Sequence, residues 1–285
     1  MVRIALPNIG RIYEPVMDLF ERAGLHVIEH SERSLFAKTV DENITLLFAR
    51  SRDIPGYVEN GAADLGITGE DFICESGADV EVLLDLGMGK ADLVLAVPDD
   101  AKYERPQQLA GRKIATEFPE VTRKYFEGLG VDVHVVEVCG ATEITPHIGV
   151  ADAIVDLTSS GTTLSMNHLK VIDHVLRTSQ KLIASKASMA GHGKKIGEIT
   201  TALHSVIEAK GKRYLMMNVP ESALDEVRKK LPGMAGPTVM KVEASSPICA
   251  VHAVVHEKEI YKVINDLKEV GARDILIVPI ERIVR

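Results

Sequence analysis

The sequence has 285 residues, of which 46% are hydrophobic and 26% are charged, and its formal net charge at pH 7 is -8. This composition is globular and supplies enough apolar material for two or three domains. The acidic balance excludes a general nucleic-acid-binding protein, because such a protein needs a basic surface to displace counterions from phosphates. We find no apolar leader and no run of membrane length, so we expect a cytoplasmic chain that makes no membrane contact.

The three cysteines are far apart and odd in number. Their spacing predicts neither a disulfide framework nor a zinc site.

From residue 1 to residue 180, short β-branched runs alternate with helical patterns. This alternation predicts an α/β fold with parallel sheets covered by helices. The strand candidates are residues 2–6, 44–49, 64–68, 92–97, 112–118, 131–138, 152–157 and 171–176.

Two stretches share the frame Gly-x-Ala-Asp followed by a buried strand, namely GAADLGITG at 61–69 and GVADAIVDL at 149–157. Similar turn residues can arise independently, but two related α/β lobes facing one cleft would also share such a frame. We therefore predict one lobe from 1–98 together with 180–211, and a second lobe from 99–179.

After a helical stretch at 193–211, the pattern changes. Residues 212–285 read strand, helix, strand, strand, helix, strand, which is the order of a ferredoxin-like βαββαβ domain. The helix in 221–233 is expected to end at a Pro-Gly pair, and the last strand is expected within 274–284.

The strand candidate at 152–157 runs directly into six small residues, TSSGTT. Phosphate sites at strand-to-helix turns use backbone N–H groups, small residues and hydroxyl donors. An ordinary Ser/Thr helix cap explains one or two hydroxyls but not a run of them around a glycine. The sequence favours a phosphate cradle, distinct from a Walker A loop or a dinucleotide fingerprint, that consists of Thr158, Ser159, Ser160, Gly161, Thr162 and Thr163.

Two carboxylates lie near this loop in the sequence. Asp156 immediately precedes it, and Glu143 lies in the segment GATEITP. Each can accept hydrogen bonds from vicinal sugar hydroxyls. For Glu143, a solvated carboxylate at a helix start is an equal alternative.

Further charged residues follow the N-terminal strand candidates. Arg11 follows the first strand, Arg50 the second, and Glu70 and Asp71 the third. Ligands of open α/β sheets bind at the carboxyl ends of the strands, and a guanidinium suits phosphate or carboxylate. For Arg11 the alternative is a salt-bridged surface residue.

Together these stretches resemble the ATP phosphoribosyltransferase family, in the long form with a C-terminal regulatory domain. The most specific segment is ADAIVDLTSSGTTLSMNHL, which resembles the family's phosphoribosyl pyrophosphate loop. Two departures stand out, since Asn8 occupies a position where the family commonly has lysine, and the loop reads Ser-Ser-Gly rather than Ser-Thr-Gly. The other similar segments are GRI, RDIPGYVENGAADLGITGED, KIATEFP, YLMMNVP and LPGMAGPT.

The resemblance implies a two-lobed catalytic part similar to type II periplasmic binding proteins. It also implies that N1 of ATP attacks C1 of phosphoribosyl pyrophosphate, and that Mg2+ is carried mainly by the pyrophosphate, without a dedicated metal site on the protein. The implied roles are phosphoribosyl pyrophosphate binding by Asp156 and 158–163, ATP or pyrophosphate binding by Arg11, Arg50, Glu70 and Asp71, and catalysis by Arg11, Glu143 and Asp156.

The resemblance further implies feedback inhibition by histidine through the C-terminal domain, and a homo-oligomer, either dimer or hexamer. Asn218 and Thr238 lie at strand boundaries and are the candidate histidine contacts. The competing hypothesis is a non-catalytic two-lobed protein that binds a small anion.

Overall fold

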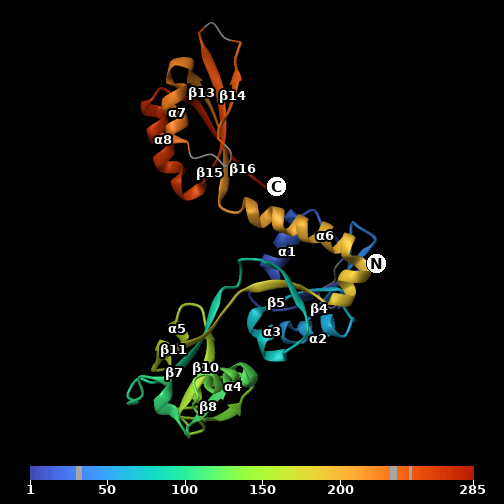
Figure 1. Cartoon of the computed structure of the whole chain (residues 1–285), viewed down its shortest axis with the longest axis vertical. Helices are drawn as coiled ribbons and strands as arrows, with labels where there is room; N and C mark the ends of the chain where they lie inside the picture. Colours follow the sequence, from blue (N-terminus) through green and yellow to red (C-terminus); the bar gives the residue numbers. More distant parts are fainter. Residues whose placement is uncertain (30–33, 232–235, 244–245) are drawn as a thin grey trace. The chain divides into compact units, whose positions relative to one another are not determined.

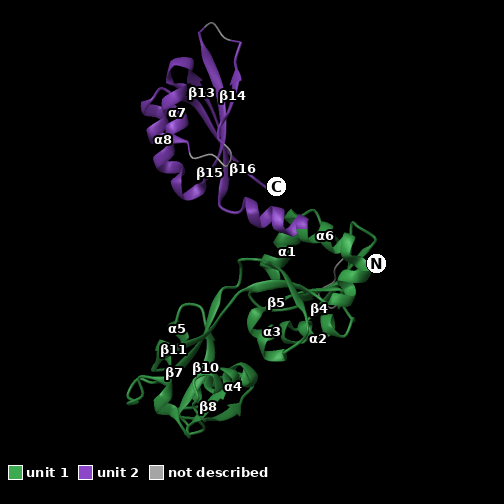
Figure 2. Cartoon of the chain, viewed as in Figure 1, with its two compact units in different colours: residues 1–200 green, residues 201–285 purple. Residues whose placement is uncertain are grey.

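The computed structural model describes residues 1–29, 34–231, 236–243 and 246–285. The chain divides into two compact units, residues 1–200 and 201–285 (Figures 1 and 2). The division falls inside helix α6 (Lys186–Ala209) rather than at the predicted boundary after residue 211. None of the described helices combines the length and the apolar character that crossing a membrane requires.

The first sheet of unit 1 has seven strands in the order β2-β3-β4-β1-β5-β12-β6. The central strand β1 is almost entirely buried, because neighbours pair with both of its edges and helices cover the sheet. The elements of this lobe are β1 (Val2–Pro7), α1 (Tyr13–Arg22), β2 (Val27–Glu29), β3 (Phe36–Thr39), β4 (Ile44–Ala49), α2 (Ile54–Glu59), β5 (Leu65–Gly69), α3 (Glu70–Ser76), β6 (Glu81–Asp85) and β12 (Gln180–Ala184).

The second sheet of unit 1 has five strands in the order β11-β7-β10-β8-β9. Its core lies between this sheet and helix α4, where Leu93, Leu95 and Phe126 are fully or almost fully buried. The elements of this lobe are β7 (Ala91–Pro98), β8 (Lys113–Thr116), α4 (Pro119–Gly128), β9 (His134–Glu137), β10 (Ala153–Thr158), α5 (Thr162–Met166) and β11 (Leu169–Thr178).

All eight strands predicted for this part of the chain are present, but the expectation of parallel sheets is wrong. Both sheets are mixed: β1 is parallel to β4 and β5, whereas β12 is antiparallel to β5, and β7 is antiparallel to β10. One reason is that β7 and β12 follow the two crossings between the sheets and enter each sheet in the opposite direction. In the first sheet, β3 is also antiparallel to its neighbours β2 and β4. The first crossing lies at 86–90, earlier than the predicted boundary at 98, and the second lies at Ser179.

The repeated Gly-x-Ala-Asp frame makes the same contacts in both lobes. The N–H of Asp64 donates to the carbonyl of Arg3, and its Oδ2 accepts the N–H of Arg3 at 2.8 Å. In the second lobe, Asp152 exchanges the equivalent pair with Lys113, with its Oδ2 accepting at 3.0 Å. In each case the aspartate ties the start of one strand to the start of its parallel neighbour, so the frame marks structurally related halves.

Unit 2 has the predicted βαββαβ order and forms an antiparallel sheet with the strand order β14-β15-β13-β16. Helices α7 and α8 cover one face (Figure 1), where Leu215, Val227, Val251 and Leu267 form the core. The predicted helix end at Pro-Gly 232–233 lies outside the described residues. The elements are β13 (Lys212–Pro220), α7 (Leu224–Lys230), β14 (Thr238–Lys241), β15 (Ile248–His256), α8 (Ile260–Glu269) and β16 (Arg273–Pro279).

Candidate active site

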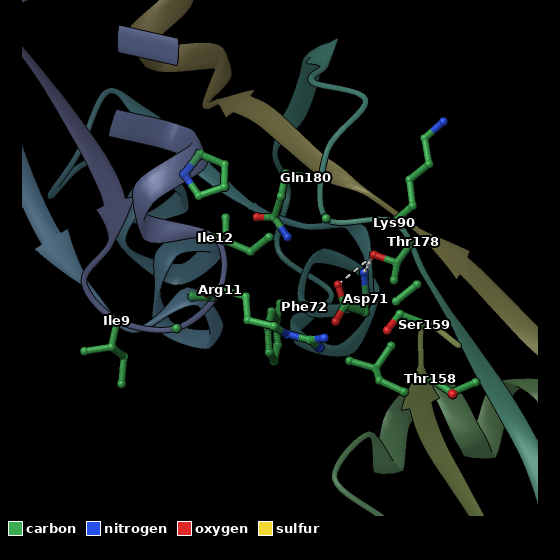
Figure 3. A pocket seen from close by; sticks show the side chains of 16 residues that line it. Ile9, Arg11, Ile12, Asp71, Phe72, Lys90, Thr158, Ser159, Thr178 and Gln180 are labelled. Atoms are coloured by element: carbon green, nitrogen blue, oxygen red, sulfur yellow. Dashed lines mark hydrogen bonds between the residues drawn. The ribbon is translucent and has the colours of Figure 1, made fainter. Parts of the chain in front are cut away.

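A cavity of about 510 Å3 opens in unit 1 where the ends of β1, β5 and β10 meet the two crossings (Figure 3). Four residues predicted from the sequence line it, namely Arg11, Asp71, Thr158 and Ser159. The other lining residues are Ile9, Gly10, Ile12, Pro15, Ser51, Phe72, Gly89, Lys90, Ala91, Leu157, Thr178 and Gln180.

Asp71 lies in the first turn of α3 and is only 3% exposed. The hydroxyl of Thr178 donates to its Oδ1 at 2.8 Å, and the backbone N–H of Asp71 donates to the same hydroxyl oxygen at 3.2 Å. Burial raises the pKa of the carboxyl, although the hydrogen bond from Thr178 acts against this. Asp71 therefore links α3 to the end of β11 at the wall of the cavity.

Arg11 lies in the turn between β1 and α1 and is exposed. Figure 3 shows its side chain extending past Phe72 toward the side of the cavity that holds Asp71 and Ser159. Arg50 is exposed at the end of β4 and is not one of the lining residues, although its neighbour Ser51 is. The structure thus brings Arg11 to the cavity and leaves Arg50 beside it.

Glu70 belongs to a second cavity, of about 500 Å3, which shares Lys90, Ala91, Ser159 and Thr178 with the first. Its carboxylate pairs with Lys181 Nζ at 3.1 Å, and the same ammonium pairs with Asp85 at 2.9 Å. Burial acts to lower the pKa of Lys181, but these two carboxylates outweigh it and raise that pKa. Glu70 is thus held by a cation.

The hydroxyl-rich loop joins β10 to the short helix α5. Thr158 Oγ1 accepts the N–H of Gly161 at 2.9 Å, and Ser160 and Thr162 share a hydrogen bond between their hydroxyls at 2.9 Å. The residue at the N-cap of α5 is Gly161, with φ of 73° and no side-chain cap. The ordinary Ser/Thr cap therefore does not account for this run of hydroxyls, and Ser159, Ser160, Thr162 and Thr163 remain exposed.

The two predicted carboxylates, Asp156 and Glu143, lie close enough to interact. Burial raises the pKa of Asp156 to about 6, with further contributions from the negative charges of Glu143 and Glu117, against a hydrogen bond from the N–H of Leu157. Asp156 and Glu117 both follow the buried part of neighbouring parallel strands, which explains why they meet. Carboxyl oxygens grouped in this way can accept hydrogen bonds from the hydroxyls of a sugar.

Several residues of this region were missed by the sequence analysis, namely Glu117, Gln180, Lys90, Thr178 and Lys181. Lys90 lies on the first crossing, which was placed too late in the chain, whereas Thr178, Gln180 and Lys181 lie in the two strands that flank the second crossing at Ser179. One signal was present, since Gly87-Met-Gly89-Lys90 places two glycines with left-handed φ and a lysine immediately before a strand.

The candidate effector residues lie in unit 2. Asn218 pairs with Ala250 on β15 and Thr238 pairs with His252, so both side chains are on the sheet face opposite the helices. The Nδ2 of Asn218 donates to Asp274 Oδ2 at 2.8 Å. Strand β15 separates the two residues in the sheet.

Over the part of the chain that the structure describes, no group of three His, Cys, Asp or Glu side chains is arranged to hold a metal ion.

The family model of ATP phosphoribosyltransferase matches residues 50–205, and that of the HisG C-terminal domain matches residues 209–282. An ATP phosphoribosyltransferase of Methanocella arvoryzae is 82% identical over 285 residues and covers 100% of both chains. One from Methanosarcina mazei is 59% identical over 288 residues, covering 99% of each chain.

Among solved structures, the ATP phosphoribosyl transferase (HisG:HisZ) complex from Thermotoga maritima contains a chain that is similar to this one. The similarity covers 73% of this chain and 99% of that chain. The TM-score is 0.65 and the sequence identity is 28%.

Proposed function

The chain belongs to the ATP phosphoribosyltransferase family, and we propose that it transfers the phosphoribosyl group of phosphoribosyl pyrophosphate to N1 of ATP, giving phosphoribosyl-ATP and pyrophosphate. The observation that carries the proposal is the hydroxyl-rich loop after β10, which adjoins a cavity that also contains an arginine. The non-catalytic alternative is less favoured, because the relatives that match over the whole chain are named as transferases.

In this proposal the loop 158–163 binds the 5-phosphate through its exposed hydroxyls and backbone N–H groups. Asp156 and Glu143 accept hydrogen bonds from the ribose hydroxyls. Because the pKa of Asp156 is about 6, its carboxyl is mostly ionised at pH 7.5 and able to accept these bonds. The two sets of groups fix the ribose at the end of β10.

The reaction forms a bond from N1 of adenine to C1 of the ribose while the bond from C1 to the pyrophosphate oxygen breaks. The electron pair of that bond leaves with pyrophosphate, so charge develops on the leaving group and on the ribose ring. Arg11 extends into the cavity and is the proposed partner of the departing pyrophosphate, with Arg50 beside it. The protein thus contributes alignment and charge rather than a nucleophile.

Mg2+ would be held mainly by the pyrophosphate oxygens and by water, and would neutralise the leaving group when bound. Asp71, the carboxylate that lines the first cavity, already accepts a hydrogen bond from Thr178. Asp71 and Glu70 are proposed to keep the cavity wall in place beside the nucleotide.

Unit 2 is proposed as the site of feedback inhibition by histidine, in a cytoplasmic homo-oligomer that is a dimer or a hexamer. Its support is the family match over residues 209–282 and the separate core of this unit. Nothing among the residues proposed for chemistry lies in unit 2.

The direct test is to mix the protein with ATP, phosphoribosyl pyrophosphate and Mg2+, and to follow the absorbance of the product together with pyrophosphate release. We expect equal amounts of both products, and none when any one component is omitted. Binding of either substrate without product in the complete mixture would favour the anion-binding alternative.

A further inference from the structure

Gln180 is a buried amide at the point where the chain returns to the first sheet. It is 8% exposed, and two hydrogen bonds fix its backbone to the first crossing: its N–H donates to the carbonyl of Met88 at 3.0 Å, and its carbonyl accepts the N–H of Leu86 at 2.9 Å. Its side chain lines the first cavity. The first crossing therefore holds the backbone of Gln180, while its side chain forms part of the cavity wall.

The side-chain oxygen of Gln180 is buried, and no group in the described parts of the chain donates a hydrogen bond to it. A buried acceptor that is left unpaired destabilises the folded protein. The nearby acidic and hydroxyl groups do not relieve this, because Asp71 and Thr178 are bonded to each other. An unpaired amide in a cavity wall points to a ligand that supplies the missing partner.

The surroundings hold the carboxamide in a narrow slot. A Cβ added to Gly89 would lie 3.0 Å from Gln180 Cγ and 2.5 Å from Ile12 Cδ1, and one added to Gly69 would lie 3.4 Å from the amide nitrogen. Figure 3 shows the carboxamide beside Ile12 on one wall of the cavity. The two glycines leave room for the amide, and its rotation about χ3 exchanges the positions of its donor and acceptor.

Part of the wall of this cavity is apolar and suits a flat ring. Ile9, Ile12, Pro15, Phe72 and Leu157 all line the same cavity as Gln180. Pockets of this kind combine apolar walls with a few polar groups that fix the orientation of the ligand. A purine base with a hydrogen-bond donor next to an acceptor matches both features.

We propose that Gln180 binds the N6 and N7 edge of the adenine of ATP, with its oxygen accepting from the N6 amino group and its nitrogen donating to N7. This inference rests on the proposed function. A carboxamide forms the same bidentate pair with adenine in DNA recognition. Binding through N6 and N7 leaves the lone pair of N1 free to attack the ribose, whereas binding through N6 and N1 would block it.

The same pairing gives specificity for the base. Guanine presents acceptors at both O6 and N7, so the carboxamide oxygen, itself an acceptor, would face the acceptor O6. A site built around a hydrogen bond rejects an analogue that leaves its polar group unpaired. Gln180 is therefore a specificity-determining residue of the nucleotide site.

The test compares dissociation constants for three triphosphates by calorimetry: ATP, 7-deaza-ATP, which lacks N7, and purine riboside triphosphate, which lacks the N6 amino group. We expect the unaltered protein to bind each analogue about 2- to 13-fold more weakly than ATP, the loss for one neutral hydrogen bond. Gln180→Leu should bind all three equally. Gln107→Leu makes the same change at an exposed position and should keep the unaltered pattern.

The inference is overturned if the unaltered protein binds ATP and 7-deaza-ATP equally, a result that needs no variant to fold. It is also overturned if folded Gln180→Leu keeps both penalties. Product formation from ATP and phosphoribosyl pyrophosphate is measured on the same samples. If the samples form product but give either of these binding results, only the role of Gln180 is contradicted. If no product forms, the proposed function is contradicted, and this inference with it.

Discussion

The interiors of the two units differ in their polar content. Among the described residues, Ser205 is the buried polar residue of unit 2, whereas unit 1 contains all the others, including Asp71, Thr178 and Gln180 at the cavity. Burying such groups costs stability unless each is fully bonded. The core of unit 2 is apolar and stabilises the fold, whereas unit 1 contains buried polar groups that can form hydrogen bonds with a ligand.

The comparison predicts that apolar truncation in unit 2 costs the most stability and little activity. Leu267→Ala removes a fully buried side chain of α8 and should lower the free energy of unfolding of unit 2 by about 2 to 5 kcal/mol. Thermal melting measures this loss, and the transferase kcat/KM well below the melting temperature should stay within about twofold. A large loss of activity in folded protein would mean that unit 2 contributes directly to the active site.

The opposite behaviour is expected for Asp156→Asn in unit 1. The lost charge-assisted hydrogen bond to the ribose should lower kcat/KM for phosphoribosyl pyrophosphate by about 10- to 150-fold, or roughly 1.5 to 3 kcal/mol. The control is Asp100→Asn, the same change at an exposed position. If both variants match the unaltered protein, Asp156 is not a ribose ligand.

The free energy of unfolding of Asp156→Asn at pH 7.5 should be higher than that of the unaltered protein. The folded protein holds the Asp156 proton up to about pH 6, but the unfolded chain releases it near pH 4. The folded state therefore binds more protons between these values, and its stability falls as pH increases from about 4 to 6 and is constant above that. Asp156→Asn should lack this fall and be more stable at pH 7.5, which chemical denaturation at several pH values would detect.

Arg11 provides a test of the leaving-group site. Arg11→Gln should reduce kcat by about tenfold or more, and at least as much as it raises KM, because its charge matters most as pyrophosphate departs. Arg52→Gln serves as the control, since Arg52 is also exposed but does not line either cavity described above. A change in KM alone would place Arg11 in ground-state binding.

The fold of unit 2 and the strands of unit 1 follow from short-range patterns, so the sequence predicts them well. The loop 158–163 and Asp156 stand out in the sequence because their residue types are unusual at a strand end, and their binding role stays a prediction. The direction of β7 and β12 could not be predicted, because side chains alternate with the same two-residue period in parallel and antiparallel sheets.

Gln180 and Lys181 were missed for a related reason. Each is an ordinary polar residue in sequence, and its contacts arise only when residues 85–90 and 179–181 come together. Local patterns do not report such long-range contacts. Glu117 was missed in the same way, since it joins Asp156 only through the pairing of β8 with β10.

A smaller effect is expected within the loop. Thr162→Val removes one exposed hydroxyl and should raise KM for phosphoribosyl pyrophosphate by about tenfold, because one hydrogen bond to a charged phosphate is lost. Thr201→Val, at an exposed position of α6, is the matched control. Equal KM values for the two variants would mean that Thr162 contributes only to the shape of the loop.

The smallest expected effect concerns inhibition by histidine, which we propose acts through unit 2. If histidine binds unit 2, Asn218→Ala should raise the histidine concentration needed for half-inhibition by about fivefold, a loss of about 1 kcal/mol of binding free energy. The KM for ATP should be unchanged, because Asn218 lies in unit 2 and its amide is bonded to Asp274.

Inhibition requires that histidine bind one conformation of the protein better than another. A chain ending at Gly211 should therefore keep some transferase activity and lose its response to histidine, provided that it folds. Equal inhibition of this shorter chain and the full chain, competitive with ATP, would instead place histidine in unit 1 and leave unit 2 a role in assembly.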